Sequence, residues 1–153
     1  MDDIAWNINQ PLPEAKFYDE KTKTFTELPK SWLDKRVQGA RPGLKVAILP
    51  RTFEKEDEKY FWLEPVRGPP TYKNLLNALY RGMHKPLPLQ KVKGAYMVPH
   101  WVYAQIGWHF QNRVALAEKY ERGELTAAEL ASDHVYFEGG QIKDGIFWPS
   151  FGS

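Results

Sequence analysis

The chain contains no cysteine, so its fold must be held together by side-chain packing and hydrogen bonds alone. This absence excludes a disulfide framework, a cysteine-ligated zinc site, an iron–sulfur cluster and a thiol nucleophile. Material for packing is abundant, because the 153 residues include 6 Trp, 8 Tyr and 8 Phe, and 42% of the residues are hydrophobic. A chain of this size and composition is expected to form one domain with a continuous core.

The first 43 residues are predicted to form an irregular arm, because prolines punctuate them and no apolar period is sustained. Only Ser31–Arg36 is expected to make a short helical turn. Aromatic surface left in water costs roughly 25 cal/mol per Å², so the arm should lie against the core or a second subunit. The prolines are Pro11, Pro13, Pro29 and Pro42, and the aromatic residues are Trp6, Phe17, Tyr18, Phe25 and Trp32.

Residues 44–153 are predicted to form a single α+β domain. Apolar runs at 44–49 and 60–63 favour two strands of a hairpin, with the charged run 54–59 at its solvated tip. Thr71 is a good N-cap for a helix over 72–83, in which leucines recur at helical spacing. Pro86 and Pro88 prevent its continuation.

The second half of this domain combines helices with a closing hairpin. Residues 91–110 fit either a strand or a helix period, and we expect extended structure up to Pro99. A helix should follow through Val114 and Tyr120 with its exit at 122–123, and Thr126–Glu129 has capping-box spacing. The tail predicts strands around 134–138 and 146–148, with turns at 139–140 and 144–145. The expected architecture is an antiparallel sheet of hairpins covered by two or three helices.

Local signatures of catalysis are absent from the sequence. It holds no G-x-S-x-G nucleophile elbow and no glycine-rich phosphate loop. Its histidines lack metal-site spacing, and the histidines flanked by tryptophan are typical of packing residues with one satisfied nitrogen. The strand-end acids Glu64 and Glu138 are expected to face water. We therefore predict no catalytic residue, metal or cofactor, while a site assembled from distant residues remains the alternative reading. The histidines are His84, His100, His109 and His134.

One charge asymmetry stands out against the net charge of only +2. Residues 65–117 hold no Asp or Glu but several cations interleaved with aromatic residues, a composition that suits phosphate neutralisation and base stacking. A nucleic-acid-binding module is therefore one hypothesis, although on the helix over 72–83 these cations also form the expected solvent face. The candidate phosphate contacts are Arg67, Lys73, Arg81, Lys85, Lys91 and Lys93.

The favoured hypothesis is a protein that acts through protein–protein contacts. Large rings on a proline-rich arm and tail bury much area at little entropic cost, and a symmetric homodimer is the commonest oligomer. The candidate interface residues are Trp6, Phe17, Tyr18, Trp32, Trp148 and Phe151. No apolar run is long enough for a membrane helix, and the start 1–4 lacks the pattern of a secretion signal, so no membrane partner is expected.

Two segments carry a resemblance to a known group of proteins. Gly68–Tyr80, with its Thr-led Leu-Leu helix, and Ser132–Gly139, with its aromatic strand, resemble small virion proteins of marseillevirus-type large DNA viruses of amoebae. The resemblance implies a non-enzymatic viral protein of unknown function, located in the virion and in the host cytoplasm or nucleus. It also implies viral or host proteins as partners.

Overall fold

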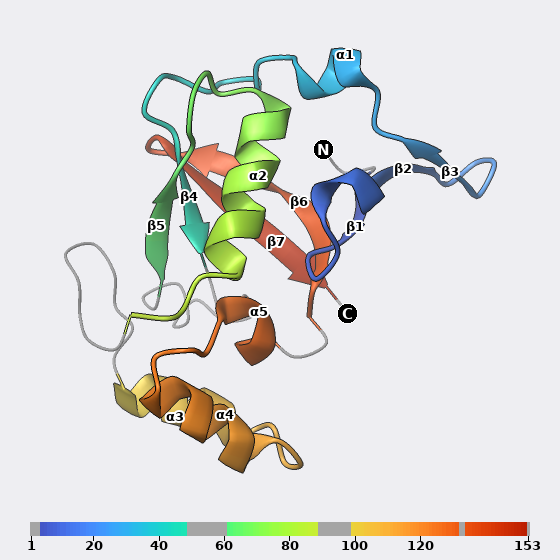
Figure 1. Cartoon of the computed structure of the whole chain (residues 1–153). Coiled ribbons are helices and arrows are strands. Elements are labelled where there is room, and N and C mark those ends of the chain that lie inside the picture. The colour runs from blue at the N-terminus through green and yellow to red at the C-terminus, as the bar shows by residue number, and fades with distance from the viewer. Residues whose placement is uncertain (1–3, 49–60, 89–98, 132–133, 153) are drawn as a thin grey trace.

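The computed structural model describes residues 4–48, 61–88, 99–131 and 134–152. Within these ranges the chain forms one seven-stranded sheet, in the order β3-β2-β1-β6-β7-β4-β5, and five α-helices (Figure 1). The predicted α+β class with a largely antiparallel sheet is confirmed; β4 and β7 make the one parallel pair among the described strands. The predicted hairpin tip at 54–59 and the extended segment at 91–98 lie outside the described residues.

Three antiparallel hairpins supply six of the seven strands. The first joins β2 (Lys16–Asp19) to β3 (Thr24–Glu27), and the second joins β4 (Lys45–Ile48) to β5 (Trp62–Pro65). The third, between β6 (Tyr136–Lys143) and β7 (Ile146–Gly152), turns at Asp144 and Gly145. Both turn residues have positive φ, which is the signature of the two-residue turn that the sequence predicts.

Helix α2 (Tyr72–Met83) covers the β4–β5 end of the sheet (Figure 1). It begins as predicted at Thr71, whose Oγ1 accepts a hydrogen bond from the backbone N–H of Asn74 at 3.3 Å. Its leucines are fully buried, and Gly82 lets the helix approach β4 closely. A Cβ at Gly82 would lie 2.3 Å from Cδ1 of Ile48.

Helices α3 (Pro99–Ile106) and α4 (Arg113–Glu121) pack on each other beyond the C-terminal end of α2, and α5 (Ala127–Leu130) lies between them and the sheet (Figure 1). The predicted helix through Val114 and Tyr120 is confirmed. So is the capping box, because Thr126 and Glu129 exchange side-chain and backbone hydrogen bonds. The ambiguity over 99–106 resolves as helix.

The N-terminal 43 residues are not irregular, and this expectation is corrected. They supply β1 (Ile4–Asn7), a 3-10 turn η1 (Leu12–Glu14), both strands of the β2–β3 hairpin and α1 (Lys30–Leu33). Pro11, Pro29 and Pro42 fall outside these elements, and Pro13 lies in the first turn of η1, where a helix tolerates proline. Strand β1 pairs with β6, so the segment is part of the sheet.

The predicted turn at Gly139-Gly140 is also wrong. Both glycines lie inside β6, where the register with β7 shifts between Phe137 and Gly140. Gly139 has φ +97°, and a Cβ on Gly140 would lie 2.4 Å from the carbonyl oxygen of Trp148. The pair therefore makes a bulge inside a strand, where glycine is needed for close approach.

Candidate interaction surface

The buried carboxylate of Glu64 forms ion pairs with Arg81 and Lys85, two of the predicted nucleic-acid contacts. Its Oε1 lies 2.6 Å from Nε of Arg81 and 2.7 Å from Nζ of Lys85, whose Nζ also reaches Oε2 at 2.9 Å. Arg81 further donates from Nη2 to the carbonyl of Pro65 at 2.8 Å. Glu64 is only 2% exposed, so the expectation that it faces water is corrected. Alternation along β5 could have shown this, because Glu64 shares a face with buried Trp62.

The two other described candidate contacts, Arg67 and Lys73, do not lie beside exposed rings. Arg67 and Lys73 are exposed at the N-terminal end of α2, whereas the exposed rings of Trp108 and Phe110 belong to the turn between α3 and α4, beyond its C-terminal end (Figure 1). A helix of this length spans about 18 Å. Lys91 and Lys93 lie outside the described residues. The described candidate contacts Arg67 and Lys73 therefore do not share a surface with these two exposed rings.

Two of the described histidines, His84 and His109, contact backbone carbonyl oxygens. Nε2 of His84 lies 2.8 Å from the carbonyl oxygen of Ile8, and Nε2 of His109 lies 3.0 Å from that of Leu130. Among the described residues, no group of three His, Asp or Glu side chains could hold a metal ion. A search of the same residues for a helix of membrane-spanning length and hydrophobicity finds none.

Three groups in the helical part have shifted pKa values. Burial raises the pKa of both Tyr103 and Tyr120. The pKa of Tyr103 is raised further by Glu121, whose Oε1 accepts a hydrogen bond from the Tyr103 hydroxyl at 3.2 Å. Burial alone would raise the pKa of Glu129, but hydrogen bonds from Lys119 and Thr126 bring it below its ordinary value of 4.5. All three shifts move the group further from titration near neutral pH, which does not suit a general acid or base.

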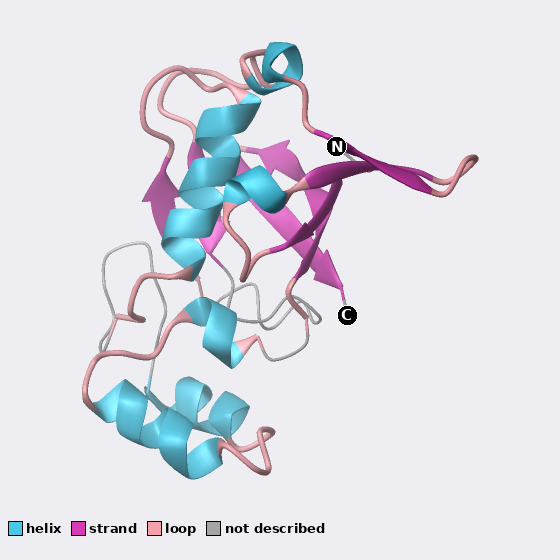
Figure 2. Cartoon of the chain, turned by 45° about the vertical axis from the view of Figure 1, so that its right-hand side comes forward, coloured by secondary structure: helices cyan, strands magenta, loops and turns pink. Residues whose placement is uncertain are grey.

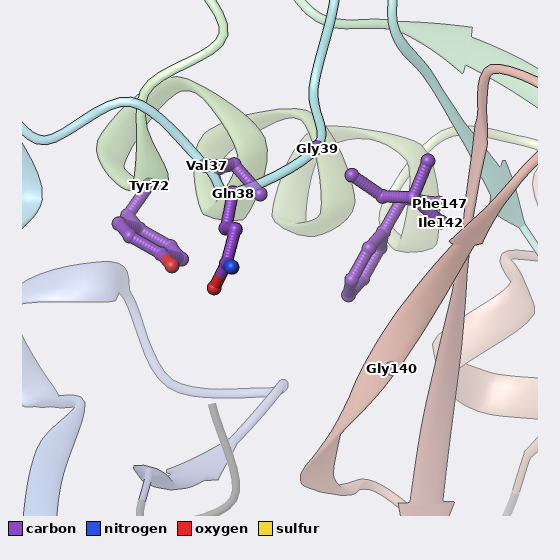
Figure 3. Close-up of a pocket in the computed structure, with 7 residues that line it drawn as sticks. All are labelled: Val37, Gln38, Gly39, Tyr72, Gly140, Ile142 and Phe147. Atoms are coloured by element: carbon purple, nitrogen blue, oxygen red, sulfur yellow. The ribbon is translucent and has the colours of Figure 1, made fainter.

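Two adjoining hollows lie beside the loop 37–44, with volumes of about 320 and 520 Å³. In the first, the Gln38 amide and the Tyr72 hydroxyl are the polar side-chain groups on a wall that is otherwise apolar or glycine (Figure 3). The second adds Arg41 and Asp144 at its edge. Their described linings do not bring a nucleophile and a base together. The first is lined by Val37, Gln38, Gly39, Tyr72, Gly140, Ile142 and Phe147.

Two of the predicted interface residues are in the core. Trp6 is 1% exposed and stacks on Tyr80 of α2 with ring centroids 6.3 Å apart, and Phe151 is 5% exposed against Phe137. Neither is available to a partner. Trp148 is half-buried on β7, where its ring meets that of Phe61 edge-on at 5.0 Å.

The other predicted interface residues belong to the β2–β3 hairpin and its base. Phe17 contacts Trp32 edge-on at 5.0 Å, and Trp32 stacks on Tyr72 at 4.3 Å, so this face of the hairpin rests on the body of the protein. Tyr18 lies on the opposite face, because neighbouring strand residues point to opposite sides. Its ring lies 5.0 Å from that of Phe25, which is 59% exposed.

The outer strand of this hairpin is an open sheet edge. β3 is the first strand in the sheet order, every residue from 24 to 27 is exposed, and the hairpin projects away from the rest of the protein (Figures 1 and 2). An edge strand offers a row of backbone N–H and C=O groups on its outer side. The other edge, β5, ends on Pro65, which cannot donate a hydrogen bond. Of the two described edges, β3 is the better template for pairing.

Comparison with protein-family models, with curated proteins and with solved structures finds no match to this chain. The resemblance to virion proteins of marseillevirus-type viruses therefore stays a prediction.

Proposed function

We propose that this is a non-catalytic protein that acts through protein–protein contacts and associates with a second copy of itself through its N-terminal hairpin. The observation that carries the proposal is the β2–β3 hairpin, an open sheet edge with a largely exposed aromatic ring at Phe25. Edge strands in proteins that stay monomeric are normally short, charged, covered or blocked by proline. β3 is short, with four residues, but it holds no proline. No described element covers β3, and the hairpin extends into solvent (Figure 2).

The polar side chains outside the hairpin support a role in protein–protein contacts better than a role in catalysis. The buried acid Glu64 is neutralised by Arg81 and Lys85, and the described histidines His84 and His109 bond to backbone carbonyls. The hollows beside the loop 37–44 lack convergent acid–base groups among their described lining residues. The exposed rings and the open edge are thus the best supported functional features.

The size of the hairpin sets the expected strength of association. Pairing along four or five residues with two or three rings per copy belongs to the class of small interfaces, below about 1,200 Å² in total. Such contacts are weak and reversible. We therefore expect a dimer that is populated at high micromolar concentration and dissociates on dilution.

Light scattering after size-exclusion chromatography tests this proposal. The mass should rise from 17.8 kDa towards twice that value as the loading concentration increases. A mass that stays at 17.8 kDa at several hundred micromolar would overturn the proposal.

A further inference from the structure

We infer that two copies pair through antiparallel β3 strands, in a register centred on Phe25, to make one continuous sheet across a two-fold axis. The inference rests on the proposed self-association and adds its surface, its partner strand and its register. The hairpin brings together the three properties it needs: an exposed edge, an aromatic stripe and charges of opposite sign at the two ends of the pairing segment. These charges are Lys23, the turn residue directly before β3 with φ +55°, and Glu27, the last residue of β3.

Symmetry restricts the register before any energy is considered. When two identical strands pair across a two-fold axis perpendicular to the sheet, each face of one copy continues into the same face of the other. Paired residues must point to the same face, and the side-chain period of a strand is two. Paired residues must therefore both be even-numbered or both be odd-numbered, so one residue lies opposite its own copy across the axis. In β3 this central residue can be Thr24, Phe25, Thr26 or Glu27.

Charge and shape then select one centre. A register centred on Phe25 places Phe25 opposite its own copy. It also brings Lys23, the turn residue before β3, beside the partner copy's Glu27 at both ends of the pairing, where the two long side chains can meet. Opposite charges and aromatic pairs are the favourable cross-strand neighbours. A centre on Thr24 places Lys23 opposite Phe25, and a centre on Thr26 places Phe25 opposite Glu27. A centre on Glu27 sets two like charges against each other, which is unfavourable.

The favoured register also extends the aromatic stripe on the outer face of the hairpin. Tyr18 and Phe25 are cross-strand partners within one copy, with ring centroids 5.0 Å apart. Pairing Phe25 with its symmetry mate lines up four rings across the dimer, from one Tyr18 to the other. This arrangement would cover the Phe25 ring, which is 59% exposed in the single chain.

Charge reversal tests the register directly. Lys23→Glu alone creates two Glu–Glu contacts in the dimer and Glu27→Lys alone creates two Lys–Lys contacts, so each should weaken dimerisation about tenfold or more. An equimolar mixture of the two variants restores both opposite-charge pairs, as does the double variant Lys23→Glu/Glu27→Lys, and each should recover dimer formation. The matched control is Lys21→Glu, an exposed turn residue with the same charge change and no partner in this register.

The outcomes separate this inference from the function on which it rests. If the wild-type protein dimerises and the single reversals leave the dimerisation constant unchanged, then association uses another surface and the β3 register is wrong. Equal weakening by Lys21→Glu, or failure of the mixture to recover, would also overturn the register. A wild-type protein that stays monomeric at every concentration would overturn the proposed function itself.

Cross-linking gives an independent readout because the chain has no cysteine of its own. The register sets Thr24 opposite the second copy's Thr26, so a mixture of Thr24→Cys and Thr26→Cys should form a disulfide-linked dimer under mild oxidation. Each variant alone places its cysteines diagonally, about 7–8 Å apart, which is beyond ordinary disulfide reach. Equally rapid cross-linking of either variant alone would contradict a register centred on Phe25.

Discussion

Lysine and glutamate are used in opposite ways in two regions of the molecule. Where α2 meets β5, Glu64 is 2% exposed and is held by Arg81 and Lys85, so these charges are satisfied within the chain. On the β2–β3 hairpin, Lys23 and Glu27 are exposed at the two ends of β3, and neither makes an ion pair within the described part of the chain. The first arrangement satisfies the charges within the fold, and the second leaves them without an ion pair there, as the proposed dimer requires. Substitutions in the first region should therefore change unfolding, and substitutions in the second should change association.

The largest expected effect on folding is at the contact between α2 and β4. Gly82→Val would place a branched side chain against Ile48, which is fully buried, where even a single Cβ comes within 2.3 Å of Cδ1. We expect the free energy of unfolding to fall by about 3 kcal/mol, the cost of overpacking a close-packed core. Chemical denaturation measures it. Lys73→Val, on the exposed face of the same helix, is the control and should cost less than about 1 kcal/mol.

Glu64→Gln should give the next largest effect. The substitution removes the carboxylate that accepts hydrogen bonds from Arg81 and Lys85, and leaves both cations without their partner. Hydrogen bonds to charged groups contribute about 1.5–3 kcal/mol, so a loss of about 2 kcal/mol is expected in urea unfolding. The matched control is Glu138→Gln, at an exposed position of β6, which should change the free energy of unfolding by no more than about 0.5 kcal/mol. Equal effects for both variants would mean that Glu64 is solvated like an ordinary surface acid.

A smaller effect concerns acid sensitivity at α5. The folded-state pKa of Glu129 lies below its ordinary value of 4.5, so its contribution to stability is present above that pH and is lost as the pH falls through the folded pKa. Glu129→Gln should therefore flatten part of the decline in melting temperature below about pH 4.5, while lowering stability at pH 7. Thermal melts of both proteins across pH 2.5–7 measure this. Parallel curves would show that the carboxylate is not stabilised by folding.

The smallest expected effect on folding comes from Phe25→Ser in the β2–β3 hairpin. The ring is 59% exposed, so the free energy of unfolding at low, monomeric concentration should change by no more than about 0.5 kcal/mol. Dimerisation should nevertheless weaken, because the pair of Phe25 rings at the axis is lost. Denaturation at low micromolar and light scattering at high micromolar concentration separate the two readouts. A large loss of monomer stability would make Phe25 a folding residue and remove the contrast.

Local signals predicted the elements that depend on neighbouring residues. Thr71 begins α2, Thr126 and Glu129 cap α5, and Asp144-Gly145 turns the last hairpin, because each feature is set by bonds within a few residues. The resulting α+β class was predictable from the alternation of strand pairs and helices.

Long-range pairing explains what the sequence did not reveal. β1 has only four residues and is stabilised by β6, whose Phe137 pairs with Trp6. Short strands whose partners are distant in sequence carry no local period. The ion pairs of Glu64 likewise join residues 17 and 21 positions away, on a helix whose leucine stripe is a stronger signal. The open edge at β3 could be recognised only after the strand order was known.

The position of β7 also governs how the polypeptide matures during synthesis. It lies between β6 and β4, antiparallel to one and parallel to the other, and joins the β1–β3 half of the sheet to the β4–β5 hairpin. Because β6 and β7 leave the ribosome after the other five strands, β1 and β4 keep one unpaired edge each until the β6–β7 hairpin is synthesised. That interval is when a nascent chain is most exposed to mispairing, and when a chaperone would have most to protect.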